Sequence, residues 1–156
     1  MIIDGMHRQM LEETGMGVQK EYDCVALARK MDMFSIVYVA QPEEAKKMAE
    51  AGADVIIAHV GCTVGGSIGV TDAAIGLDEA AKQTQAIIDA GKSVRDDIIY
   101  LSHGGPILSP PDAAYINERT DAVGFVGAYN LERIEVERSL VAITQEFKSI
   151  PVHRKK

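Results

Sequence analysis

The stretch FSIVYVAQPEEAKKMAEAGADVIIAHV, residues 34–60, contains a complete strand–helix–strand unit. Residues 34–40 form a short apolar run rich in β-branched side chains, which is typical of a buried strand. A helix is expected next, because Pro42 suits a first helical turn and Gly52 suits a helix end. Residues 54–60 form a second apolar run. A helix between two buried strands predicts that the strands are parallel.

The same alternation continues through the rest of the chain. We expect helices over residues 18–33, 77–94, 109–120 and 131–150. Strands are expected over residues 97–103 and 122–128, and a strand stub over residues 1–4. Asp78 and Asn130 are candidate N-caps, and Ser109 with Asp112 has the spacing of a capping box. No linker or low-complexity segment interrupts the pattern. Residues 1–150 are therefore predicted to form a single domain, and residues 151–156 a loose tail.

Two closures of the parallel sheet fit this pattern, an open doubly wound sheet and part of a barrel. No GxGxxG follows the first strand, so a dinucleotide-binding fold has no support. Glycines after the strands are more typical of a (β/α)8 barrel, but a complete barrel needs about 250 residues. We therefore expect an α/β fold with parallel (β/α) repeats of TIM-barrel type. It would be a partial barrel of about four to five βα units, completed by self-association or by an N-terminal segment outside this chain.

Composition excludes several classes of function. The net charge of −7 argues against binding to nucleic acid or to an anionic membrane surface. No segment is apolar for long enough to span a bilayer, and no signal peptide opens the chain, so a cytoplasmic location is expected. The two cysteines, Cys24 and Cys62, are far apart, which indicates free thiols in a reducing compartment.

Two similar phrases point to a binding site. His59 and His103 each end an apolar run and are each followed by glycine. Adjacent parallel strands lie about 4.8 Å apart, so both imidazoles can reach one site and act there as acid, base or ligand. Gly61, Gly104 and Gly105 would let peptide N–H groups approach a small anion. The alternative is that the histidines bond to neighbouring loops and that the glycines only form turns.

The phrase LEETGMG, residues 11–17, offers two carboxylates. Glu12 or Glu13 would act as a general base, or both would lie in a solvated turn. A divalent metal is an alternative cofactor. His59 and His103 could supply two ligands, but no carboxylate nearby in the sequence supplies a third.

The phrase GAYNLERI, residues 127–134, follows the last expected strand. Gly127 and Ala128 open a helix there and are candidates for holding a phosphate. Glu132 and Arg133 are either part of an anion clamp or an ion pair on a helix surface.

Four motifs together resemble the phosphoenolpyruvate hydrolase-like family, also described as TIM-barrel signal transduction proteins. They are IDGMHRQMLEETGMG (3–17), EAGADVIIAHVGCTVGGSIG (50–69), LSHGGPILSPPDAAYI (101–116) and GFVGAYNLERIEVE (124–137). The resemblance runs over residues 3–147 and implies a (β/α)8 barrel, of which this chain resembles the last half or so. The resemblance places ten of the candidate residues on motif positions of the family: Glu12, Glu13, His59, Gly61, His103, Gly104, Gly105, Gly127, Glu132 and Arg133. One departure is Tyr129-Asn130, where the family usually has two serines.

The resemblance implies an enzyme that acts on a small phosphorylated or carboxylated keto or enol acid by hydrolase or lyase chemistry. His59 and His103 would position and protonate the acid, Glu12 or Glu13 would activate water or remove a proton, and the glycine loops with Arg133 would hold the anionic group. The alternative is a non-catalytic barrel module that binds a ligand or partner in signal transduction. The expected partners are a small anionic ligand and further copies of the chain in a homo-oligomer, with neither nucleic acid nor a membrane.

Overall fold

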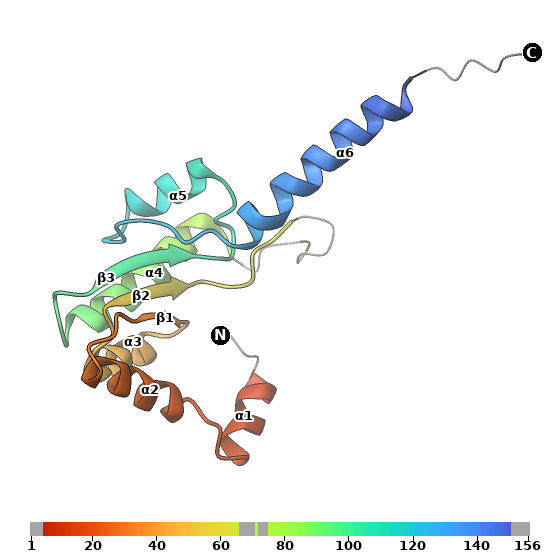
Figure 1. Cartoon of the computed structure of the whole chain (residues 1–156). Helices are drawn as coiled ribbons and strands as arrows, with labels where there is room; N and C mark the ends of the chain where they lie inside the picture. The colour runs from red at the N-terminus through yellow and green to blue at the C-terminus, as the bar shows by residue number, and fades with distance from the viewer. Residues whose placement is uncertain (1–4, 66–70, 72–74, 151–156) are drawn as a thin grey trace, which may run out of the picture.

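The computed structural model describes residues 5–65, 71 and 75–150. From β1 to α5, strands and helices alternate as the sequence predicts (Figure 1). In chain order the elements are α1 (Gly5–Glu13), α2 (Gln19–Lys30), β1 (Ile36–Val39), α3 (Pro42–Ala51), β2 (Val55–His59), α4 (Leu77–Lys92), β3 (Ile99–His103), α5 (Pro110–Asn117), the π-helix η1 (Asn130–Ile134) and α6 (Glu135–Lys148).

The three strands form one parallel sheet in the order β1-β2-β3, which confirms the parallel α/β prediction. The register pairs Tyr38 with Ile57 and His59 with His103. Because successive side chains of a strand point to opposite faces, Tyr38, His59 and His103 share one face of the sheet. This small sheet is consistent with part of a TIM-barrel-like fold, and the described residues do not form a closed barrel.

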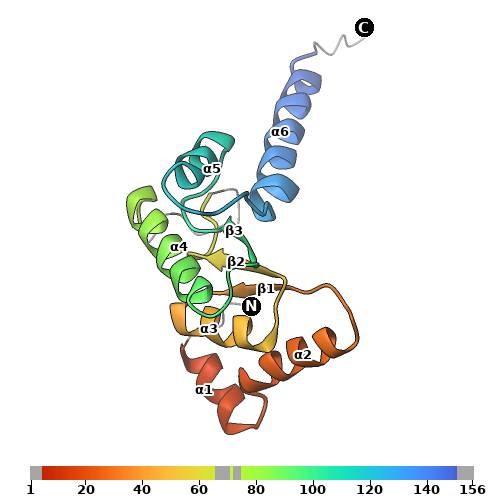
Figure 2. The same ribbon diagram turned by 90° about the vertical axis from the view of Figure 1, so that its left-hand side faces the viewer.

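The core lies between the sheet and the helices α3 and α4, which cover one of its faces (Figures 1 and 2). Its buried side chains come from alternate positions of the strands and from the facing helices, and include Val39, Ile56, Ala58, Tyr100, Met48, Ile87 and Ile88. On the opposite face of the sheet, Ile36 and Ile99 remain 58% and 45% exposed. The face that carries the two histidines is therefore the more open one.

The helix caps agree with the sequence in one case and differ in another. At α5, the Asp112 carboxylate accepts hydrogen bonds from the N–H and the hydroxyl of Ser109, which confirms the capping box. The prediction that Asp78 caps α4 is wrong, because Gly76 occupies the N-cap position. Asp78 lies in the first turn instead, where its carboxylate accepts a hydrogen bond from the Tyr115 hydroxyl.

The predicted fourth strand over residues 122–128 is not a regular strand. Val123 N–H donates to Tyr100 O at 2.9 Å, and Val126 N–H donates to Ser102 O at 2.9 Å, so the segment does run beside β3. Its one parallel bridge joins Ser102 to Phe125. Gly124 interrupts the run, Val123 is 74% exposed, and Ala122 is the one buried residue among 122–128, so few buried side chains hold a longer ladder.

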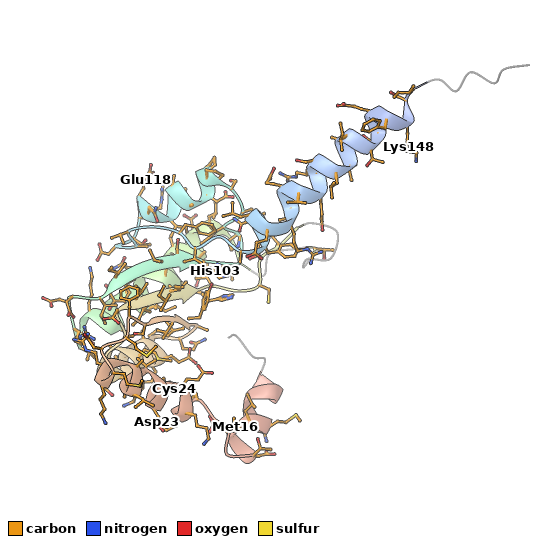
Figure 3. All side chains as sticks on the ribbon, in the orientation of Figure 1. Met16, Asp23, Cys24, His103, Glu118 and Lys148 are labelled. Carbon is orange, nitrogen blue, oxygen red and sulfur yellow. The ribbon has the colours of Figure 1, made fainter. Side chains whose placement is uncertain are left out.

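The two ends of the described chain differ most from expectation. Glu12 and Glu13 lie in the last turn of α1, a helix that the sequence did not predict. At the other end, α6 extends away from the body, with Lys148 at its far end (Figures 1 and 3), and none of its side chains is buried. The expected strand stub over residues 1–4 and tail over 151–156 lie outside the described residues. None of the helices in the described ranges is long and apolar enough to span a membrane.

Candidate functional site

The carboxyl ends of β2 and β3 bring two histidine rings together. His59 and His103 are the last residues of their strands and are paired in register. Their ring centroids lie 4.7 Å apart and the rings are nearly perpendicular, at 80°. His103 is buried and His59 is half-buried. The structure thus places the two imidazoles in contact with each other, and their chemical roles stay predictions.

A third ring, which the sequence reasoning missed, completes the cluster. The Tyr38 ring on β1 lies 5.7 Å from that of His59 and 5.2 Å from that of His103, edge to face with both. Phe125 stacks on the other side of His103 at 6.4 Å. The repeated His-Gly phrase indicates only the ends of β2 and β3, and Tyr38 lies outside it. Counting alternate residues along the first strand, in phase with the histidines, is the signal that finds Tyr38.

Hydrogen bonds place the ring hydrogen on opposite nitrogens of the two imidazoles. His103 Nδ1 lies 2.7 Å from the carbonyl oxygen of Val126, which can only accept, so Nδ1 carries a hydrogen and the lone pair of the uncharged ring is on Nε2. His59 Nδ1 accepts the N–H of Gly61 at 3.2 Å, so its hydrogen is on Nε2. The cluster therefore offers one ring nitrogen that accepts a proton and one that donates a hydrogen bond.

His59 is neutral at physiological pH. Burial first, and the neighbouring His103 ring second, lower the pKa of His59 from 6.5 to about 4. A neutral imidazole with its hydrogen on Nε2 can stabilise a developing oxyanion by hydrogen bonding, without carrying a charge of its own.

The lowered pKa of His59 predicts a loss of stability in acid. The unfolded chain protonates this histidine near pH 6.5, but the folded chain does so only near pH 4, so the free energy of unfolding falls as the pH drops between these values. We expect a loss on the order of 2 kcal/mol after allowance for the ring's partial exposure. Urea titrations across this pH range would measure it.

The matched variant is His59→Asn, because its side-chain oxygen can still accept the Gly61 N–H. This variant should lack the part of the pH dependence that is due to His59. An unchanged pH profile in the variant would show that the lowered pKa of His59 has no effect on stability.

The glycine loops after β2 and β3 are bonded to each other. Gly105 N–H donates to Gly61 O at 2.8 Å, and Gly61 N–H in turn donates to His59 Nδ1. Gly61, Gly104 and Gly105 all have positive φ, at 130°, 82° and 55°. Two of the amides predicted to hold an anion thus have intrachain acceptors, and these bonds position the His59 ring.

Asn130 links the loop after the fourth segment to the loop after β3. Its Oδ1 accepts the N–H of Ala128 at 3.2 Å, and its Nδ2 donates to Leu108 O at 3.2 Å. Asn130 is buried and opens η1 without capping it, so its prediction as a helix cap is wrong. Gly127 lies beside this linkage, against the side chain of Leu131.

Arg133 of η1 is paired with a carboxylate of α6, which continues directly from η1. Its Nη2 lies 3.1 Å from Glu137 Oε1, and its guanidinium group sits 4.7 Å from the centroid of the Tyr129 ring. Of the two alternatives for Glu132 and Arg133, the ion pair on a helix surface is formed by Arg133 with Glu137 instead, and Glu132 is exposed. The free guanidinium of an anion clamp would require Arg133 to leave Glu137.

The two carboxylates of α1 are bonded locally as well. Glu12 Oε1 accepts the N–H of Val18 at 3.0 Å, and Glu13 Oε1 accepts from Gln9 Nε2 at 2.8 Å. Both are exposed. Within the described ranges, no cluster of three or more His, Cys, Asp or Glu side chains is arranged to hold a metal ion.

A cavity of about 540 Å³ lies beside the cluster, at the free side of β1. Tyr38 lines it, together with apolar side chains of α1, α2 and β1 that include Leu11, Val25 and Ile36. Neither histidine lines this cavity. The ring cluster and the cavity therefore meet only at Tyr38.

Comparison with known proteins reveals similarity along nearly the whole chain. The sequence profile of the phosphoenolpyruvate hydrolase-like family matches residues 1–150. The chain is 48% identical over 150 residues to the ToMV susceptible protein tm-1(GCR26) and to the ToMV resistance protein Tm-1(GCR237) of Solanum lycopersicum, over 96% of this chain and 20% of each of those proteins. It is 31% identical over 156 residues to the putative transcriptional regulatory protein y4pA of Sinorhizobium fredii (strain NBRC 101917 / NGR234), over 100% of this chain and 26% of that protein. The chain thus spans about a fifth to a quarter of the length of these relatives.

Proposed function

Since the chain belongs to the phosphoenolpyruvate hydrolase-like family, we propose that it binds a small phosphorylated or carboxylated keto or enol acid at the carboxyl ends of β2 and β3. Hydrolysis or lyase-type cleavage of this acid is the proposed chemistry. The observation that carries the proposal is the close pair of imidazoles that hold their ring hydrogens on opposite nitrogens.

The tautomers suggest a division of labour between the two rings. His103 Nε2 has a lone pair and accepts a proton from water or from the substrate, as a general base does. His59 Nε2–H donates a hydrogen bond to the oxygen on which negative charge develops. Tyr38, which touches both rings, keeps them perpendicular to each other and is a positioning residue.

The charged candidate residues could take part only after they leave their present partners. Glu12, Glu13 and Arg133 already have partners in the described structure. A ligand would have to displace Glu137 from Arg133, and either carboxylate would have to leave its own donor, before these residues could act on a substrate. The proposal therefore depends on the two rings more than on the charged groups.

Ligand binding by the whole chain tests the proposal. Phosphoenolpyruvate, phosphonopyruvate and oxaloacetate would each be added to the protein, with and without divalent metal ions, and the melting temperature measured. A ligand at one hundred times its Kd stabilises by about 2.7 kcal/mol, or roughly 5–10 °C for a domain of this size. If none of these acids stabilises the protein, the proposed ligand class is wrong.

The matched variant is His103→Asn. The asparagine amide keeps a donor for the Val126 carbonyl, so the fold is retained, but the Nε2 lone pair is lost. We expect the ligand-induced shift to fall by at least half in this variant, and turnover to fall by about 10²–10⁴-fold. An unchanged shift and unchanged turnover would exclude His103 from the site.

The second candidate function is a non-catalytic binding module. It is favoured by the intrachain partners of the Gly61 and Gly105 amides and of Arg133, which leave few groups free for an anion. Binding of an acid without release of phosphate or of a cleaved keto acid would support this candidate over the enzyme. A small anionic ligand, a cytoplasmic location and self-association belong to both candidates.

A further inference from the structure

One face of α6 carries a regular apolar stripe that stays exposed among the residues that the structure describes. Val136, Leu140, Ile143 and Phe147 are spaced by four, three and four residues, and they are 50%, 60%, 45% and 68% exposed. None of the α6 side chains is buried, and the helix points away from the sheet and its helices in both views (Figures 1 and 2). The stripe is thus available to a partner along the whole length of the helix.

The spacing identifies the kind of partner. Apolar residues that alternate three and four apart form the seam of a coiled coil, in which each side chain inserts between side chains of a second helix. Ile150, just beyond α6, continues the spacing and is 61% exposed. Val141 is also exposed, at 57%, but lies off this seam. The best-matched partner is therefore another helix with the same seam.

We propose that two copies of this chain associate through α6 in an antiparallel pair. The register that matches both seams over the full helix places a two-fold axis between Val141 and Ala142. Val136 then packs against Phe147 of the partner subunit, and Leu140 packs against Ile143 of the partner subunit. Such a self-complementary contact closes into a dimer and leaves no seam residue of α6 uncovered.

Charge favours the antiparallel direction. In this register Glu137 falls beside Thr144 of the partner subunit, and Ser139 falls beside Glu146 of the partner subunit, so no like charges meet at the seam. The body of each copy lies at the amino end of α6 (Figure 1). A parallel pair would bring two bodies together at one end, although each chain has a net charge of −7, and the antiparallel pair keeps them at opposite ends. Antiparallel helix dipoles also attract each other.

The size of the seam sets the expected affinity. Four to five side chains from each copy bury less surface than the ~800 Å² per partner of a standard interface. We therefore expect a dimer with a Kd on the order of 10 µM. The contact does not involve the ring cluster, so this inference stands or falls independently of the proposed ligand site.

Two valine variants of the full chain test the seam, with sedimentation equilibrium as the measurement. Val136→Glu places a charge on the seam, and Val141→Glu makes the same change on the same helix but off the seam. Neither valine is buried, so both variants should keep the wild-type circular dichroism spectrum and melting temperature. We expect wild type and Val141→Glu to dimerise and Val136→Glu to stay monomeric at about ten times the wild-type Kd. A monomeric wild type, or equal behaviour of the two variants, would overturn the proposal.

Disulfide cross-linking tests the direction of the pair. In a background with Cys24→Ser and Cys62→Ser, single variants Val136→Cys and Phe147→Cys would be oxidised alone and as a mixture. The antiparallel pair predicts cross-linked heterodimer in the mixture and little homodimer from either variant alone. Homodimer from Val136→Cys would indicate a parallel pair. A dimer without any cross-link would mean that α6 packs on the body of the partner, and both results contradict the inference.

Discussion

Replacing Gly104 by alanine is expected to lower the free energy of unfolding by about 4 kcal/mol, because it combines backbone strain with a steric clash. Gly104 has a φ of +82°, in the region that L-residues rarely adopt. A Cβ at this position would overlap the carbonyl oxygen of Gly61 and approach His59 Cε1 to 3.0 Å. The Gly61 carbonyl is backbone and accepts the Gly105 N–H, so it cannot move aside without breaking the link between the two loops.

Gly15→Ala is the matched control for this experiment. Gly15 has a similar φ of +71°, but a Cβ there would meet no atom within 4 Å. Its replacement should therefore cost only the strain of the backbone conformation, about 1 kcal/mol. Urea unfolding followed by circular dichroism would measure both variants. Equal losses would show that the approach of the two loops at Gly104 is not tight.

Replacing Gly91 by alanine is expected to cost about 3 kcal/mol, although alanine favours a helix over glycine. Gly91 lies in the last turn of α4, and a Cβ there would overlap the hydroxyl of Tyr100 on β3. Tyr100 is buried, and no hydrogen-bond partner for its hydroxyl is present in the described part of the chain. Burial also raises the pKa of Tyr100 to about 12, so the group is a neutral phenol at any physiological pH.

Tyr100→Phe provides the test of this cause. Removing a buried hydroxyl that has no partner should leave stability unchanged or raise it by about 1 kcal/mol. In the Tyr100→Phe background, Gly91→Ala should lose less than half of what it loses in the wild type, because the ring carbons still approach the new Cβ to 3.1 Å. A double-mutant cycle from urea titrations gives the coupling. Additive losses would mean that the hydroxyl is not what excludes a side chain at Gly91.

Local pattern in the sequence was enough to determine the repeating unit of the fold. The apolar runs that become β1, β2 and β3 are short and separated by helices with clear signals, such as Pro42 at the start of α3 and Gly52 at its end. These signals act within a few residues, through φ preference and burial, so they do not depend on distant parts of the chain. The same local signals placed His59 and His103 at the ends of successive strands.

Only the tertiary structure decided how the site groups are used. The tautomers of the two histidines depend on Gly61 N–H and on the Val126 carbonyl, and the second of these comes from a segment 23 residues away in sequence. Tyr38 contacts both histidine rings because the register of β1 with β2 places it on the same face of the sheet. Arg133 found Glu137 rather than Glu132 because side chains four apart on a helix are neighbours.

The exposed stripe of α6 shows the same division. Its apolar spacing is legible in the sequence, because helical periodicity is a local property. The sequence does not show whether that face is covered, because burial depends on which other surfaces come within contact distance once the whole chain has folded. The sequence by itself determined which elements form and which residues end each strand. The tertiary structure decided the partners of each side chain, because hydrogen bonds and packing between distant segments form only when the sheet brings them together.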